Sequence, residues 1–116
     1  SSWKGDGVTV ASIGDYYAGN GQVDWLEKHG FASEEIGSHA SVRDTSELLY
    51  LQPSGIRALP VTLAGVPDGV TGNPARASKE IGQAMLELKI GAAVAQMRRI
   101  RQSGSAAPPV GSAAAE

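Results

Sequence analysis

Two histidines and a small group of carboxylates are the side chains of this sequence that could do chemistry. His39 stands in a stretch rich in Gly, Ser and Ala, and Asp44 follows shortly after it. Imidazole and carboxylate are ligands that zinc and manganese accept, and they also form an acid–base pair near neutral pH. In the alternative interpretation His39 is a solvated loop residue and Asp44 caps a helix. A complete zinc site needs three or four protein ligands, so these two residues do not make one alone.

The other polar candidates have simpler interpretations. His29 lies between Lys28 and Gly30, where an imidazole close to the last carbonyls of a helix is the expected arrangement. Glu34 and Glu35 could orient His39, although a solvated acidic segment is the simpler explanation. The chain contains no Cys, which excludes disulfides, thiolate metal sites and thiol nucleophiles.

The elements that would position His39 and Asp44 can be predicted from periodicity and capping signals. Residues 8–13 are mostly β-branched and apolar, which predicts a strand buried on both faces. Residues 22–28 predict a short helix that ends before a glycine suited to the C′ position. Asp44, with Glu47 three residues later, predicts a second helix that opens on a capping box. Loops with one short strand are expected in residues 56–70.

A long helix is predicted to begin at Asn73 as N-cap, with Pro74 in the first helical position, and to end near Arg101. Its apolar residues form two rows, which indicates cover on more than one side. The first row is Ile81, Met85, Leu88, Ala92 and Ala95, and the second is Leu86, Ile90, Ala93 and Met97. Gly82 and Gly91 would each cost about 1 kcal/mol relative to alanine, which close approach of a neighbouring element would explain. The Ser-, Ala-, Gly- and Pro-rich residues 102–116 predict a disordered tail.

One strand cannot form a sheet, because both of its edges would remain unpaired. Residues 1–101 are therefore expected to be the C-terminal part of an α/β domain. The other strands would come from a missing N-terminal segment or a second chain.

Charge and hydropathy exclude some classes of partner. The formal net charge of -2 gives no electrostatic basis for binding nucleic acid or an acidic membrane. No apolar run approaches the length needed to cross a bilayer, and the first residues do not resemble a signal peptide. A soluble, cytoplasmic protein is the expectation.

Two segments resemble the signatures of one family. Residues 39–53 read HASVRDTSELLYLQP, and residues 69–78 read GVTGNPARAS. The first resembles the His-Ala…acidic-Thr-Ser stretch of the creatininase family of metal-dependent amidohydrolases. The second resembles that family's C-terminal Gly-Val-x-Gly-(Asp/Asn)-Pro segment. The resemblance covers about residues 8 to 100.

This resemblance implies a three-layer α/β sandwich with a mostly parallel sheet, assembled as a homo-oligomer, commonly a hexamer. It also implies two divalent ions, zinc or manganese, that activate a water for hydrolysis of a small cyclic or linear amide. His39 matches the catalytic histidine that passes a proton to the leaving nitrogen. Asp44 matches a metal-binding position that is usually glutamate, and its side chain is one methylene shorter. The family's N-terminal metal motifs have no counterpart here, so most metal ligands would come from the absent half.

The remaining predicted site residues would line the substrate pocket. They are Tyr16, Tyr17, Trp25 and Ser38, although packing in the core or at the surface is the more common role of the aromatic rings. Two other functions remain open. The chain could be a non-catalytic partner subunit that stabilises an assembly, or a small free-standing binding module.

Overall fold

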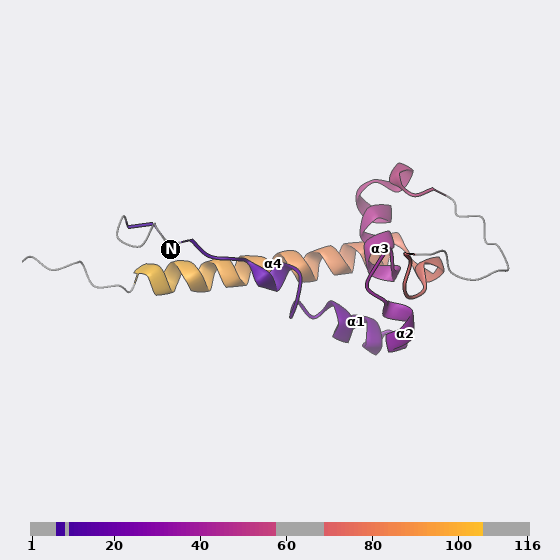
Figure 1. The fold of residues 1–116 in the computed structure, drawn as a ribbon, viewed down its shortest axis with the longest axis horizontal. Coiled ribbons are helices and arrows are strands. Elements are labelled where there is room, and N and C mark those ends of the chain that lie inside the picture. Colours follow the sequence, from indigo (N-terminus) through magenta and orange to yellow (C-terminus); the bar gives the residue numbers. More distant parts are fainter. Residues whose placement is uncertain (1–6, 9, 58–68, 106–116) are drawn as a thin grey trace, which may run out of the picture.

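The structure, a computed structural model, describes residues 7, 8, 10–57 and 69–105. The helical elements in these residues comprise both α-helices and short 3-10 turns. In chain order they are η1 (Gly14–Tyr16), α1 (Gln22–Lys28), α2 (Ser33–Ile36), α3 (Val42–Leu51), η2 (Pro53–Gly55), η3 (Pro74–Arg76) and α4 (Lys79–Ser105). Figure 1 shows α4 as one long rod, with α1, α2 and α3 gathered around its N-terminal half.

The predicted α/β sandwich is wrong for the part of the chain that the structure describes. Ranges 7–8, 10–57 and 69–105 contain helices, turns and coil but no strand. Of the predicted strand at residues 8–13, the described residues are coil, and Gln96 of α4 donates a side-chain hydrogen bond to the Ser12 carbonyl at 3.2 Å. A strand forms when a second strand pairs with its backbone, and no other described segment forms such a pair with these residues. The short strand expected in residues 56–70 falls mainly on residues 58–68, outside the described ranges.

Helix α1 spans the predicted residues, and its C-terminus follows the predicted chemistry. Gly30 has φ +81° and follows the C-cap His29. Its N–H donates to the Glu27 carbonyl, and the N–H of Phe31 donates to the Leu26 carbonyl, both at 3.1 Å. This pair of bonds is the Schellman arrangement, in which glycine provides the left-handed residue. The side chains of Leu26 and Phe31 then both enter the core.

Helix α4 begins later than predicted. Asn73 and Pro74 open a single 3-10 turn instead, and Ala77 is extended, with ψ 144°. Ser78 then provides the cap, because its Oγ accepts a hydrogen bond from the Ile81 N–H at 3.2 Å. The helix continues to Ser105, beyond the Arg101 end point predicted from composition. With 27 residues at about 1.5 Å each, α4 extends for roughly 40 Å.

Helices α3 and α4 cross in close contact at Gly82. A Cβ on this residue would collide with the carbonyl of Ser46 and lie 2.9 Å from the Tyr50 Cβ. Ser46 is fully buried at the crossing, and its Oγ accepts a hydrogen bond from the Ser78 N–H at 3.2 Å. The predicted close approach is therefore confirmed at Gly82. It is wrong at Gly91, where a Cβ would meet no atom of the described residues within 4 Å.

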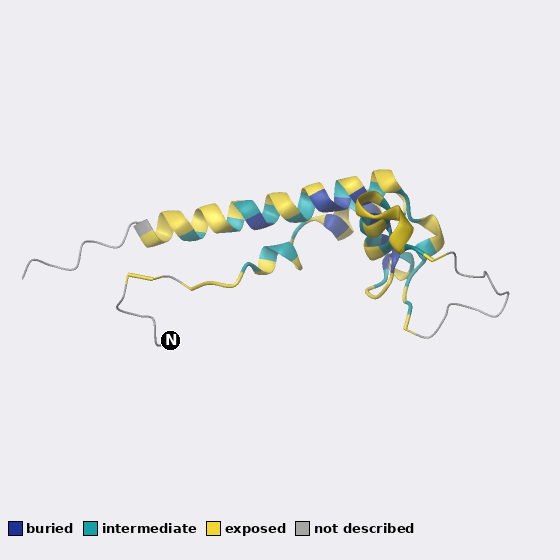
Figure 2. Ribbon diagram, turned by 90° about the horizontal axis from the view of Figure 1, so that it is seen from above, coloured by how far each residue is buried: buried dark blue, intermediate teal, exposed yellow. Residues whose placement is uncertain are grey.

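The core forms where α1, α2, α3 and the first half of α4 meet (Figure 2). Its buried members are Leu26, Phe31, Ile36, Val42 and Met85. The second apolar row of α4 is only partly covered, because Leu86 and Ala93 are buried while Ile90 and Met97 are exposed. None of the helices in the described residues is both long enough and apolar enough to cross a membrane.

Candidate functional site

The His39 segment is a short loop, residues 37–41, that connects α2 to α3. Two of its residues have positive φ: Gly37 at +60° and Ala40 at +47°. Alanine in the left-handed region costs roughly 1 kcal/mol, so contacts elsewhere must hold this turn. Two side chains of α3 contribute, since Arg43 Nη2 donates to the Gly37 carbonyl at 3.2 Å and Thr45 Oγ1 to the Ala40 carbonyl at 3.3 Å.

Thr71 anchors the same loop from a distant part of the sequence. Its Oγ1 accepts hydrogen bonds from the backbone N–H groups of Ser38 at 2.7 Å and His39 at 2.9 Å. Its own N–H donates to the His39 carbonyl at 2.9 Å. The backbone on both sides of the imidazole is thereby bound to one threonine. Residues 39–53 and residues 69–78 therefore contact each other directly.

Glycines allow this contact between the two backbones. A Cβ on Gly37 would collide with the Thr71 carbonyl, and a Cβ on Gly72 with the Glu35 carbonyl. Gly72 also has φ +80°, which side chains rarely tolerate. The Asn73 N–H completes the junction by donating to the Glu35 carbonyl at 2.7 Å.

The carboxylate of Glu35 is the charged group at the centre of this junction. Orientation of His39 is one role that the sequence suggests for Glu35, but its hydrogen bonds in the structure go to other residues. Its carboxylate accepts hydrogen bonds from the Ala32 N–H at 3.1 Å, from Arg76 Nη1 at 2.8 Å and from Asn73 Nδ2 at 3.4 Å. These donors lower the pKa of Glu35 below its ordinary value of 4.5, with the Ala32 N–H as the largest cause and Arg76 next. Arg76 also stacks over the Phe31 ring, 3.8 Å from its centroid, and so ties η3 to the turn after α1.

The lowered pKa of Glu35 predicts acid sensitivity of this junction. A carboxylate with a depressed folded-state pKa stabilises the fold above its unfolded value, and the stabilisation is lost as pH falls through the folded value. Stability to urea should therefore fall as pH drops below 4.5, and Glu35→Gln should make this fall shallower. Urea unfolding midpoints of the unmodified chain and of Glu35→Gln, taken at a series of pH values from neutral downwards, measure this pH dependence. Glu80, whose pKa is lowered by its own N–H and by Ser78, should leave residual pH dependence in the variant. An unchanged acid slope in Glu35→Gln would contradict the assignment.

His39 and Asp44, the predicted catalytic and metal residues, are both exposed. Asp44 does not cap α3, because the helix already begins at Val42 with Ser41 as N-cap, which places Asp44 in the first turn. An acidic residue there interacts favourably with the helix dipole. Within the described ranges, no three His, Asp or Glu side chains are grouped closely enough to hold a metal ion. These residues therefore do not fit a two-ion centre by themselves.

Of the predicted pocket residues, only Ser38 lies in the His39 loop. Tyr16 is the last residue of η1 and Tyr17 follows it. Their ring centroids are 5.0 Å apart, and Tyr17 is 81% exposed. Trp25 stacks on His29 with 3.6 Å between ring centroids, and His29 Nδ1 lies 2.7 Å from the Trp25 carbonyl. His29 thus sits at the last carbonyls of α1, as predicted.

A groove of about 490 Å³ lies elsewhere, between the first described residues and the end of α4. Its lining residues are Gly7, Ala11, Ile13, Met97, Ile100, Arg101 and Gly104. None of the predicted pocket residues is among them, so the predicted grouping of Tyr16, Tyr17, Trp25 and Ser38 does not correspond to this groove.

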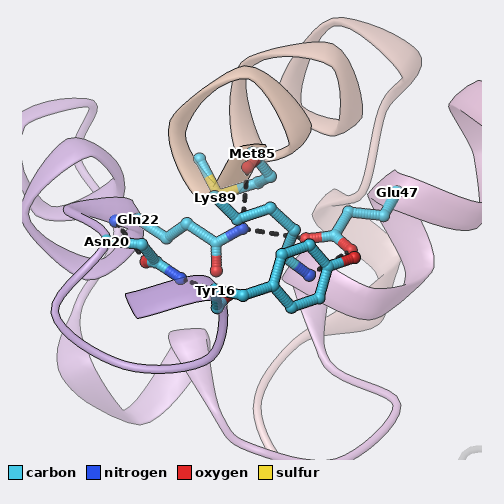
Figure 3. Close-up of polar contacts among 6 residues, drawn as sticks. All are labelled: Tyr16, Asn20, Gln22, Glu47, Met85 and Lys89. Atoms are coloured by element: carbon cyan, nitrogen blue, oxygen red, sulfur yellow. Dashed lines mark hydrogen bonds and ion pairs between the residues drawn. The ribbon is translucent and has the colours of Figure 1, made fainter. Parts of the chain in front are cut away.

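A second polar cluster, which the sequence analysis missed, joins η1, α1, α3 and α4 (Figure 3). The Lys89 Nζ lies 2.7 Å from Glu47 Oε2, and both side chains are mostly buried, at 13% and 15% exposure. The buried Gln22 amide donates to Glu47 Oε1 and to the Met85 carbonyl, both at 2.9 Å. The Tyr16 ring covers the Lys89 ammonium group, which lies 4.8 Å from the centroid of that ring. Every one of these contacts crosses between elements, so the cluster holds the fold together.

A signal for this cluster was present in the sequence. Lys89 follows Met85 by four residues and precedes Ala92 by three, so it occupies the same helical row as apolar residues. A charged residue in a covered row requires a partner of opposite charge. Its spacing after Asp44 predicts a capping box for Glu47, and this local explanation conceals the contact of Glu47 with Lys89.

Comparison of the chain with protein-family models, with curated proteins and with solved structures found no match. The creatininase resemblance therefore remains a prediction from residues 39–53 and 69–78.

Proposed function

We propose that this chain is a subunit or portion of a metal-dependent amidohydrolase that cleaves a cyclic or linear amide C–N bond, with His39 as proton donor to the leaving nitrogen. The observation that supports the proposal is the junction at Thr71. The two segments that resemble the family are far apart in the sequence, and their backbones are hydrogen-bonded around His39.

The chemistry of amide cleavage explains why such a junction would be useful. An amide nitrogen leaves only when it receives a proton as the C–N bond breaks, and imidazole can supply one near neutral pH. The donor must be held in position while its ring stays accessible. In this loop, Thr71 holds the backbone at His39 and the preceding residue, and the His39 side chain is exposed.

The proposal assigns most ligands of the zinc or manganese ions to a second polypeptide, which could be the N-terminal half of the same enzyme. The metal ions would supply the activated water when bound. His39 and Asp44 alone do not form a metal site, so the role proposed for this chain is proton transfer and support of the pocket.

A non-catalytic subunit that stabilises an assembly is the second candidate. It is favoured by exposed apolar side chains on α3, where Leu48 is 39% and Leu51 64% exposed. Apolar residues that remain exposed together are common where another chain binds. In this case the His39 loop would be a structural connection only.

The experiment is a comparison of two histidine variants in the native assembly, purified from its source through a tag on this chain and supplied with zinc or manganese. His39→Ala should reduce amide hydrolysis about 10²- to 10⁴-fold, the usual contribution of a general acid. His29→Ala is the matched control, because His29 is also exposed and should leave turnover unchanged. Both variants should retain the assembly in size-exclusion chromatography. Full activity in His39→Ala, or no hydrolysis of any amide by the unmodified assembly, would overturn the proposal and favour the second candidate.

A further inference from the structure

One side of α4 carries an apolar row that is partly exposed among the described residues, and at its C-terminal end Met97 also lines the groove that faces Gly7, Ala11 and Ile13. Ile90 is 51% exposed, Met97 is 46% exposed, and Val94 lies between them in the same row. The spacing of four and then three residues is that of a helix-pairing seam. Figure 2 shows the C-terminal half of α4 mostly exposed, beyond the elements that cover its first half. A continuous seam of this kind can accept a second helix.

Charges of opposite sign mark the two ends of this seam. Glu87 precedes Val94 by two helical turns, and Arg101 follows it by two turns, both exposed and in the same row. Gly91 lies beside the seam, and no atom of the described part of the chain lies within 4 Å of the point where its Cβ would stand. A neighbouring backbone or a long side chain can therefore approach closely at Gly91.

We propose that α4 pairs with α4 of a second copy of this chain, antiparallel, around a two-fold axis close to Val94. In this arrangement Glu87 of each copy faces Arg101 of the other, and Met97 faces Gly91. A parallel pair would instead place Glu87 against Glu87 and Arg101 against Arg101, which is unfavourable. The charge pattern thus complements itself only in the antiparallel orientation, and such a two-fold contact is closed after two copies.

The pairing does not depend on the proposed enzymatic function. It involves the side of α4 that carries Ile90, Val94 and Met97, whereas the His39 loop lies at the other end of the molecule, at the junction of α2, α3 and Thr71. A test of one proposal can therefore fail while the other succeeds.

Charge reversal tests the orientation in solution. Sedimentation equilibrium of the full chain, between about 10 μM and 1 mM, covers the range of weak pairings. Glu87→Arg and Arg101→Glu should each weaken the dimer by about tenfold, because each variant creates two like-charge contacts. The double variant should restore the dissociation constant to near that of the unmodified chain. A monomer at all concentrations, or a dimer that neither single variant weakens, would overturn the proposal.

Cross-linking tests the position of the axis. Because the sequence has no Cys, Val94→Cys introduces a single thiol beside the proposed axis, and mild oxidation should yield a disulfide-linked dimer. Ile90→Cys is the control, since its two thiols would lie about 12 Å apart along the helix axes, too far for a disulfide. Equal cross-linking of both variants would indicate a parallel pair and contradict the proposal. No cross-linking of Val94→Cys would contradict the placement of the axis.

Discussion

Gly82→Ala is expected to lower the free energy of unfolding by about 2–3 kcal/mol, as overpacking at a closed contact does. The added methyl group would meet the backbone carbonyl of Ser46 and the Cβ of Tyr50, neither of which can move without moving α3. Any shift of α3 would also stretch the hydrogen bond from the Ser78 N–H to the buried Ser46 Oγ. The loss should appear as a lower urea midpoint in circular dichroism at a helical wavelength.

Gly91→Ala is the matched control in the same helix. Its Cβ would point into open space, so only helix propensity should act, and stability should rise by about 0.5–1 kcal/mol. The two substitutions are chemically identical, and their effects should have opposite signs. Similar effects of Gly82→Ala and Gly91→Ala would show that α3 does not approach α4 as closely as described.

Lys89→Met should lower the free energy of unfolding by about 2–4 kcal/mol, because it leaves the Glu47 carboxylate without its cation in a mostly buried site. Within the described ranges, the Gln22 amide would be the one remaining side-chain donor to that carboxylate. The double variant Glu47→Leu with Lys89→Met should recover more than half of the loss, since apolar residues can replace a buried pair at little cost. Urea unfolding of the two single variants and the double variant gives the coupling free energy directly.

The ion pair between Arg99 and Asp15 provides the comparison. Its N–O distance of 2.6 Å is shorter than the 2.7 Å between Lys89 and Glu47, but the Arg99 side chain is 61% exposed. Arg99→Met should therefore change stability by less than about 1 kcal/mol, because solvent and salt screen an exposed pair. If both substitutions had equal effects, the N–O distance rather than burial would govern how much these ion pairs stabilise the fold.

Some features could be predicted from the sequence because their causes are local. The extent of α1 follows from its helical pattern and from Gly30, whose positive φ terminates the helix. The helical character of α4 follows from its composition, and the position of His29 at the end of α1 follows from neighbouring residues. In each case the interacting atoms lie within one or two turns of each other in the chain.

Other features were decided by contacts between distant segments. Residues 8–13 have the composition of a strand, but a strand requires a pairing partner, and the described neighbour is α4. Glu47 fits a capping box by spacing, yet its carboxylate lies against Lys89, 42 residues away in the sequence. The junction of the His39 loop with Thr71 likewise depends on hydrogen bonds between residues separated by 32 and 33 positions.

The two glycines of α4 show the division most clearly. The sequence alone determined that Gly82 and Gly91 stand inside a helix, where each is intrinsically unfavourable compared with alanine. Only the tertiary structure decided that Gly82 is required and Gly91 is not, because α3 crosses at one and no described atom lies near the other. Helix propensity is a property of neighbouring residues in the chain, whereas steric exclusion depends on what the fold brings to that point.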